Sequence, residues 1–246
     1  NGNIANTSGR IEKYTQELNR LNVEYNSKSS KKRMLVDMEN SYEGFARSVK
    51  MVLKADELKN IAMYGTVSGL INVDKKFVTA IEIALGGAMQ NIVVETEQDA
   101  KTAIEYLKRA RGGRATFLPI SSVNGRVTVP DLRNSKGYIG VASELVQCDR
   151  KYQGIIMNLL GRVAVVDNID NAIAISRQYG YKFRIVTLEG DVLNSGGSMS
   201  GGSTNQSGGF LSRANDIKVL TGELSDLAGK IKQYTAEREQ LQNDLN

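Results

Sequence analysis

Both ends of the chain carry the same spacing of apolar residues, and this spacing constrains the architecture more than any other feature. Near the N-terminus the steps of three and four residues run through Ile11, Tyr14, Leu18, Leu21 and Tyr25. Near the C-terminus they run through Ile217, Leu220, Leu224, Leu227, Ile231 and Tyr234. Such steps place the apolar side chains on one narrow face of an α-helix, which is typical of a coiled-coil seam.

Two helices at opposite ends of one chain can pair with each other. They run antiparallel if the chain enters and leaves the middle region at neighbouring points. The alternative for each end is an amphipathic helix that lies on a globular core. Because both seams are narrow, pairing is favoured, and residues 1–42 and 213–246 are predicted to form the two segments of an antiparallel coiled coil.

The middle region contains two similar copies of one pattern, each reading helix, strand, helix, strand. Asp74-Lys75-Lys76-Phe77 is matched by Asp149-Arg150-Lys151-Tyr152, and Asn91–Val94 is matched by Val163–Val166. Arg114–Leu118 is likewise matched with Arg184–Leu188. The sequence therefore predicts an α/β (α+β) fold: two similar α/β subdomains, at residues 43–120 and 138–212, joined by an extended linker at 121–137 and inserted between the two helices of the coiled coil.

A glycine-rich stretch ends the second copy. After a strand and a tight turn, two glycine pairs, Gly196-Gly197 and Gly201-Gly202, bracket Met199. A phosphate-binding loop would need Lys-Ser/Thr after the last glycine, whereas Ser203-Thr204 follows here. A mobile linker would leave the preceding strand and turn unexplained. We therefore favour a glycine-rich edge strand that pairs with another protein chain.

The composition argues against most catalytic chemistry. The chain has no histidine, which removes Ser-His-Asp and Cys-His catalysis and nearly all zinc sites. The single Cys148 cannot form an internal disulfide and suits a reducing cytosol. No apolar run approaches the roughly 20 residues that cross a membrane. We therefore predict no catalytic residue, no metal site, no cofactor and no membrane partner.

Two motifs resemble those of a known family. Gly113-Arg114-Ala115-Thr116-Phe117-Leu118-Pro119 resembles the Gly-Arg-x-Thr-Phe-Leu-Pro segment in the hinge domain of SMC proteins, the long ATPases of chromosome condensation and segregation. The stretch from Arg184 to Gly202 resembles the Thr-Leu-Asp/Glu-Gly-Asp … Gly-Ser-Met-Ser-Gly-Gly signature of the same domain. Many members carry proline before the first glycine, where this chain has Ser195. The short linker resembles that of a bacterial or archaeal member, and a bacterial one is favoured.

The resemblance implies a ring-shaped, two-fold homodimer in which the first subdomain of one chain meets the second subdomain of the other. The carried-over interface residues are Gly196, Gly197, Met199, Gly201 and Gly202. The internal repeat, rather than the resemblance, leads us to expect the matching strand edge on the partner at Asn91, Ile92, Val93 and Val94. The resemblance also implies ATPase heads, which this sequence lacks because it has no Walker motif. Other subunits of the SMC complex would bind at those heads, and the protein would act in the cytoplasm on the nucleoid.

DNA is the other partner that the resemblance implies. One basic cluster interrupts the N-terminal seam and consists of Lys28, Lys31, Lys32 and Arg33. A second cluster follows a predicted helix and consists of Lys108, Arg109, Arg111 and Arg114. A solvated helix end is the alternative explanation, above all for the second cluster. With a net charge of only +5 and no interleaving of aromatic and basic residues, we expect weak, sequence-independent binding.

Two other functions remain open at this point. A tandem α/β regulatory module could bind a small ligand at the glycine-rich loops, and such a ligand would raise the melting temperature. A nucleotide-utilising enzyme is less well supported, because both histidine and the Lys-Ser/Thr of a phosphate loop are missing.

Overall fold

The computed structural model of the chain describes residues 2–202 and 209–245. The chain divides into two compact units. The first, called the arm unit here, contains Asn1–Glu43 and Arg213–Asn246, and the second, called the body, contains Gly44–Ser212. Ser203 and Thr204, which follow the last glycine of the glycine-rich stretch, lie outside the described residues.

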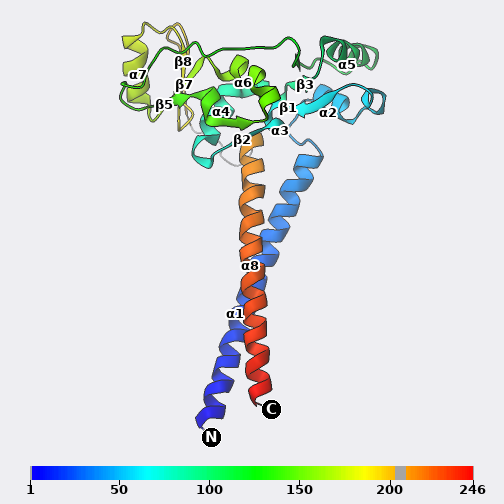
Figure 1. Cartoon of the computed structure of the whole chain (residues 1–246), viewed down its shortest axis with the longest axis vertical. Helices are drawn as coiled ribbons and strands as arrows, with labels where there is room; N and C mark the ends of the chain where they lie inside the picture. Colours follow the sequence, from blue (N-terminus) through cyan, green and yellow to red (C-terminus); the bar gives the residue numbers. More distant parts are fainter. Residues whose placement is uncertain (1, 203–208, 246) are drawn as a thin grey trace. The chain divides into compact units, whose positions relative to one another are not determined.

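The arm unit consists of two long helices, α1 (Gly2–Asn40) and α8 (Phe210–Leu245). The first residues of α8, 210–212, belong to the body. The rings of Tyr14 and Tyr234 lie 5.5 Å apart, and the Lys28 ammonium lies 3.0 Å from the Glu223 carboxylate. Because residues early in α1 meet residues late in α8, the helices run antiparallel, as predicted (Figure 1). The buried seam contains Leu18, Leu21, Leu220, Leu224 and Leu227.

The body contains two larger sheets. The first has the order β1-β3-β4, with β3 antiparallel to β1 and parallel to β4. Its strands are β1 (Met63–Thr66), β3 (Ile92–Val94) and β4 (Phe117–Pro119). The second has the order β10-β9-β8-β7-β5, and only β7 and β8 are parallel. Its strands are β5 (Tyr138–Val141), β7 (Val163–Val166), β8 (Arg184–Thr187), β9 (Val192–Leu193) and β10 (Met199–Ser200).

The helical elements follow the repeat. The first copy contains α2 (Arg47–Lys54), η1 (Asp56–Leu58), α3 (Val67–Leu70), η2 (Lys75–Phe77), α4 (Val78–Leu85), η3 (Gly86–Gln90) and α5 (Glu97–Arg109). The second contains η4 (Ala142–Leu145), η5 (Arg150–Tyr152), α6 (Gln153–Leu160) and α7 (Ile169–Gln178). The predicted α/β fold with two similar copies is therefore present.

A third, two-stranded sheet joins the copies. Its strands β2 (Ile71–Val73) and β6 (Val146–Cys148) are equivalent strands of the two copies, and they pair antiparallel with Asn72 opposite Gln147. An antiparallel pair of equivalent strands is two-fold symmetric. The two copies are therefore related by a pseudo-two-fold axis at this pair.

The two copies share one hydrophobic core. A cluster that includes Ile81 and Leu160, both fully buried, lies between the two larger sheets with α4 and α6. The outer face of the first sheet is covered by α2 and α5, and the outer face of the second by α7. Figure 1 shows α5 and α7 at opposite ends of this layered body.

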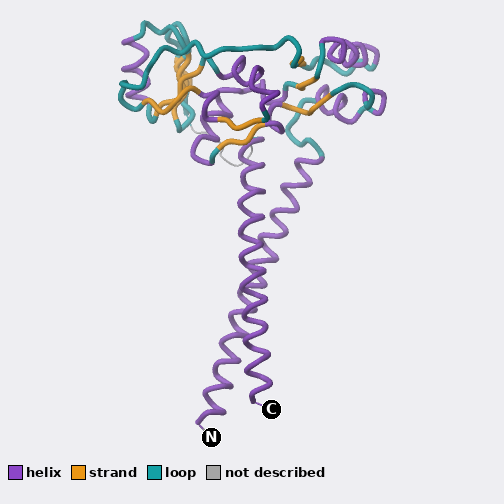
Figure 2. Tube along the Cα trace, viewed as in Figure 1, coloured by secondary structure: helices purple, strands orange, loops and turns teal. Residues whose placement is uncertain are grey.

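The linker at 121–137 contains neither helix nor strand and runs as a long loop along the body (Figure 2). Its Val129 and Leu132 are buried in the cluster of the second subdomain. The Thr128 N–H donates to the Gly161 carbonyl at 2.9 Å. The linker is therefore packed along the second subdomain rather than held away from it.

One detail of the predicted repeat was wrong. Leu118 pairs with Val93, Val186 pairs with Val165, and all four residues face the shared core. Leu118 therefore corresponds to Val186 rather than to Leu188. By the same shift, Arg114 corresponds to Lys182, because the loop before the last strand is longer in the first copy.

The equivalent helices α5 and α7 each begin with a side-chain cap. The Thr96 hydroxyl accepts from the Asp99 N–H at 3.2 Å, and the Asp99 carboxylate accepts from the Thr96 N–H at 3.0 Å. Asn168 caps α7 by accepting from the Asn171 N–H at 3.0 Å. The Thr96 hydrogen bonds lower the pKa of the Asp99 carboxyl. The reciprocal cap of α5 and the single cap of α7 fix where each of these helices begins.

Candidate functional site

The β9–β10 hairpin presents the most exposed strand of the body. β10 is the last strand of the five-stranded sheet, and both of its residues are exposed, with Met199 at 50%. Within the part of the chain that the structure describes, no strand pairs with the outer side of β10. An edge of this kind can accept another strand.

The hairpin register shows which backbone groups face outward. The Asn194 N–H donates to the Ser198 carbonyl at 2.9 Å, so these two residues form a hydrogen-bonded pair. Hydrogen-bonded pairs alternate with non-hydrogen-bonded pairs in an antiparallel ladder. Met199, opposite Leu193, therefore directs its N–H and C=O toward the outer edge.

Each of the four glycines has a reason of its own within the chain. Gly196, Gly197 and Gly202 have φ values of +87°, +95° and +136°, which side chains disfavour. A Cβ on Gly201 would lie 2.4 Å from an oxygen of the Asp191 carboxylate. The predicted reason, close approach of another backbone, is therefore not the only constraint on these positions.

Asp191 has a structural role in the turn before β9. Its carboxylate accepts a hydrogen bond from the Thr187 hydroxyl at 3.1 Å, and its own N–H donates to that hydroxyl at 2.9 Å. These bonds close the turn between β8 and β9. Asp191 thus fixes the turn that leads from β8 into the β9–β10 hairpin.

The expected strand edge at Asn91–Val94 was wrong. β3 lies between β1 and β4, so both of its hydrogen-bonding sides are used within the chain. Ile92, Val93 and Val94 are 0%, 1% and 0% exposed. A continuous β-branched run is typical of a central, fully buried strand, and this signal could have excluded an edge.

The free edge next to β3 is the outer side of β4. The Ile92 N–H donates to the Thr116 carbonyl, and the Ile120 N–H donates to the Val94 carbonyl, both at 2.9 Å. Along a strand, successive residues direct their backbone groups to alternate sides, so Phe117 directs its N–H and C=O away from β3. No strand of the described residues pairs with this side of β4.

The internal repeat emphasises this second edge. β4 corresponds to β8, and β8 carries β9 and then β10 on its outer side. In the first copy no strand of the described chain takes the equivalent place beside β4. The body therefore has one sheet with an added hairpin and one sheet that lacks it.

The first basic cluster belongs to α1 in the arm unit. Lys28 forms ion pairs with Glu24 at 3.1 Å and with Glu223 at 3.0 Å, and hydrogen bonds to Glu223 and Glu24 raise the pKa of its ammonium. The other three members form no ion pair among the described residues. Lys31 and Arg33 are exposed. These two side chains and that of Lys32 can meet an anion, whereas the charge of Lys28 is already balanced.

The second basic cluster belongs to the body, at the end of α5 and in the loop before β4. Arg109 pairs with Glu57 at 2.8 Å. The exposed side chains of Lys108, Arg111 and Arg114 form no ion pair within the described ranges. Their place at a helix C-terminus is also favourable for the helix dipole, so the charge has a structural benefit as well.

Nothing described in the structure forms a metal or thiol centre. Residues 2–202 and 209–245 contain no group of three or more His, Cys, Asp or Glu side chains that could hold a metal ion. Burial raises the pKa of the half-buried Cys148 thiol, which disfavours the reactive thiolate. Among the described helices, none has the length and apolar character that a membrane span requires.

Known proteins resemble the chain along nearly its full length. Residues 59–176 match the family model for the SMC proteins Flexible Hinge Domain. The chromosome partition protein Smc of Halothermothrix orenii is 41% identical over 222 residues, which are 88% of this chain and 18% of that protein. The Smc of Bacillus subtilis is 41% identical over 206 residues, which are 82% of this chain and 17% of that protein.

Solved structures match as well. The asymmetric dimer of the Geobacillus stearothermophilus SMC hinge domain matches with a TM-score of 0.87 at 35% identity, covering 98% of both chains. The Pyrococcus furiosus Smc hinge domain with an extended coiled coil matches with a TM-score of 0.54 at 26% identity, covering 99% of this chain and 85% of that chain.

The fold defines a class: an α/β domain with an internal repeat, inserted in sequence between two helices that form an antiparallel coiled coil. The matching family model, the two curated relatives and the solved structures are all SMC proteins or SMC hinge domains. The chain belongs to the SMC hinge domain family. It spans less than a fifth of the length of these two curated Smc relatives, at 18% and 17%.

Proposed function

We propose that this chain is the dimerisation hinge of an SMC ATPase that acts in chromosome condensation and segregation. The observation that carries the proposal is the pair of free strand edges, β10 in one subdomain and β4 in the other. The similar hinge domain of G. stearothermophilus, described as an asymmetric dimer, supports it. Through this dimer the hinge joins the coiled-coil arms of two chains.

In the proposed dimer of this chain, β10 of one chain pairs with β4 of its partner, and the second contact repeats the first by two-fold symmetry. The outward N–H and C=O of Met199 and Phe117 supply the backbone hydrogen bonds. Gly196, Gly197, Gly201 and Gly202 flank β10 and leave room at its edge, since a Cβ on Gly196 or Gly202 would meet nothing within 4 Å. Ile92, Val93 and Val94 support β4 from behind and do not touch the partner strand.

DNA contact is the second part of the proposed function. Within the two basic clusters, the cations without an ion pair among the described residues are Lys31, Lys32 and Arg33 in the arm unit and Lys108, Arg111 and Arg114 in the body. Lys28 and Arg109 contribute less, because each already forms an ion pair. Such cations bind phosphates without reading sequence, and each neutralised phosphate steepens the log–log salt dependence on duplex DNA by about 0.9.

The rest of the proposal concerns the whole protein. The ATPase heads would lie in parts of the whole protein other than this hinge. Other subunits of the complex would bind to those heads. The hinge would act in the cytoplasm on the nucleoid, where the chromosome lies.

Sedimentation equilibrium of the unmodified chain tests dimerisation directly. The chain has a mass of 26.9 kDa, so we expect twice this mass at low micromolar concentration across a hundredfold range. A mass that stays at 26.9 kDa would contradict the hinge dimer. In that case a module that binds a small ligand would become the better explanation.

A further inference from the structure

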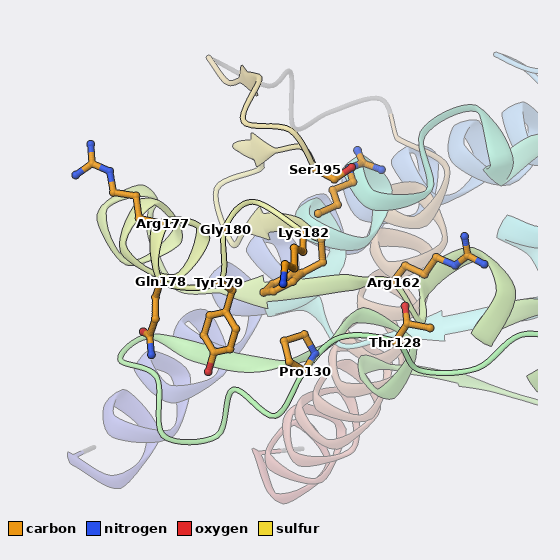
Figure 3. Close-up of a pocket in the computed structure, with 11 residues that line it drawn as sticks. Thr128, Pro130, Arg162, Arg177, Gln178, Tyr179, Gly180, Lys182 and Ser195 are labelled. Atoms are coloured by element: carbon orange, nitrogen blue, oxygen red, sulfur yellow. The ribbon is translucent and has the colours of Figure 1, made fainter.

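We propose that a basic pocket in the second subdomain binds a phosphate-bearing ligand of nucleotide size. The cavity has a volume of about 960 Å³ and lies where β7 and β8 begin and α7 ends (Figure 3). The residues that line it are Thr128, Pro130, Arg162, Arg177, Gln178, Tyr179, Gly180, Lys182, Phe183, Arg184 and Ser195. All of them belong to one compact unit of one chain.

The charge of the pocket has one sign. Among the described residues, four cationic side chains and no carboxylate line the cavity. None of the four forms an ion pair among the described residues. In Figure 3 the labelled side chains of Arg177 and Arg162 both extend away from Lys182, so these cations line different sides of the cavity. Four cations around one cavity, with no ion-pair partner among the described residues, favour an anion there.

Arg184 supplies an independent observation. Its two terminal nitrogens donate to the carbonyls of Ala84 at 2.9 Å and Ile83 at 3.1 Å, which holds its guanidinium against the end of α4. Its Nε is buried and has no hydrogen-bond partner. A buried N–H of a cation without an acceptor is unfavourable. A phosphate in the cavity would supply a negative charge close to this incompletely satisfied guanidinium.

The remaining wall is apolar and suits a flat group. The rings of Tyr179 and Phe183 meet edge to face, with centroids 5.9 Å apart, and Pro130 lies beside Tyr179 (Figure 3). The Tyr179 hydroxyl donates to the Asp131 carbonyl at 3.3 Å, so its hydrogen-bonding group is already used. Cations and an apolar surface in one cavity match a ligand with both a phosphate and a base.

The volume of the cavity favours a nucleotide over a lone anion as its ligand. Pockets for small ligands have volumes of roughly 300–1,000 Å³, and this cavity lies at the upper end of that range. A single phosphate would leave most of it empty. A free nucleotide and the 5′-phosphorylated end of a nucleic-acid strand present the same chemistry, and either can fill the cavity.

The site goes beyond the proposed function and does not depend on it. The pocket is formed within one chain, so its occupancy requires no dimer. Its residues are also different from the two basic clusters proposed for DNA contact. A failure of the dimer proposal would therefore leave the pocket proposal standing, and the reverse also holds.

The test uses the full 246-residue chain and a double variant, Arg162→Gln with Lys182→Gln. Both side chains are exposed and form no hydrogen bond within the described structure, so the fold should be retained, which circular dichroism checks. The matched control, Lys101→Gln with Lys136→Gln, removes the same charge from exposed sites elsewhere in the body. Any difference between the two variants then reports the pocket rather than net charge.

Titration calorimetry with inorganic pyrophosphate and with ATP at low salt measures the binding. The loss of one hydrogen bond to a charged group weakens the binding affinity by roughly tenfold or more. We therefore expect the pocket variant to bind roughly a hundredfold more weakly than the wild type, and the control variant to bind within about threefold of it. Equal weakening in both variants, or no binding of any probe at millimolar concentration, would overturn the proposal.

Fluorescence anisotropy with a labelled decathymidylate, carrying either a 5′-phosphate or a 5′-hydroxyl, distinguishes the sources. Tighter binding of the phosphorylated strand, displaced by pyrophosphate, identifies a strand end as the ligand. Pyrophosphate and ATP binding without any preference between the two strands identifies a free nucleotide. Both outcomes support the pocket, provided that the pocket variant abolishes them.

Discussion

Replacing Met199 with proline should convert the dimer into a folded monomer. The Met199 N–H faces the outer edge of the sheet, so proline there removes no hydrogen bond among the described residues. The preceding Ser198 must be extended before proline, which a hairpin strand already satisfies. The outer edge of β10 loses its donor and gains a ring that blocks an approaching strand.

The magnitude follows from the two-fold symmetry. Each interface loses one backbone hydrogen bond, and the partner carbonyl is left buried without a donor, which costs about 1–3 kcal/mol. A dimer with two equivalent interfaces loses about 2–6 kcal/mol, so the dissociation constant rises between about thirtyfold and twenty-thousandfold.

Sedimentation equilibrium measures the change, and Met199→Val is the matched control. Valine keeps the backbone N–H and favours extended structure, so this variant should dimerise with an affinity close to the wild type. Far-UV circular dichroism and the melting temperature verify that both variants are folded. If Met199→Pro remains as tightly dimeric as Met199→Val, β10 is not part of the interface.

Three further perturbations test other parts of the structure. Reversing Lys31, Lys32 and Arg33 to glutamate should weaken duplex DNA binding in a gel shift and reduce the log–log salt slope by about 2.7; an unchanged midpoint at low salt would count against this cluster. Leu160→Ala opens a cavity in the core that both subdomains share, and should lower the free energy of unfolding by about 2–5 kcal/mol in a single urea transition; two separate transitions would contradict a shared core. Asp99→Ala should cost about 1 kcal/mol at neutral pH through the lost capping box. Because the N-cap threonine lowers the pKa of the Asp99 carboxyl, this stabilisation is full above its ordinary value of 3.8 and is lost as the pH falls through the lowered one; a stability difference that persists in acid would refute the capping role.

The coiled coil and the repeat could be predicted because both depend on local patterns. Spacing along a helix determines which side chains share a face, so the seam residues Leu18 and Leu224 were identifiable from sequence alone. The match between Asp74-Lys75-Lys76-Phe77 and Asp149-Arg150-Lys151-Tyr152 likewise located equivalent helix starts. Neither inference required knowing which elements touch.

The strand edges could not be predicted in the same way, because they depend on the order of strands in space. The run Asn91–Val94 reads as a good strand, but its neighbours on both sides come from distant parts of the chain. Phe117 is next to Leu118 in sequence, yet only the pairing with β3 shows that its backbone groups face outward. The basic pocket was missed for the same reason, since Arg162 and Lys182 lie on separate segments.

The glycine-rich stretch shows a different limit of sequence reasoning. A glycine can be required by positive φ, by a close contact within the chain or by a partner, and the sequence does not distinguish these causes. The backbone of Gly197 and the space around Gly201 both give reasons within the chain. Alanine at these positions would disturb the hairpin and the interface together, and this is why proline at Met199 is the sharper test.

The departure from internal symmetry explains how a repeat can build a closed dimer. Two identical subdomains would present two identical edges. Here the second copy adds β9 and β10 to its sheet, while the first copy ends at β4, so one chain carries two different, complementary edges. Two complementary edges on one chain produce either a closed ring or an open filament. The pseudo-two-fold axis through β2 and β6 relates the two subdomains. A single partner chain, related to the first by a two-fold axis parallel to this one, can therefore pair with both edges at once. Closure at two copies pairs both of these edges, and this predicts that the protein stops at the dimer rather than growing into larger assemblies.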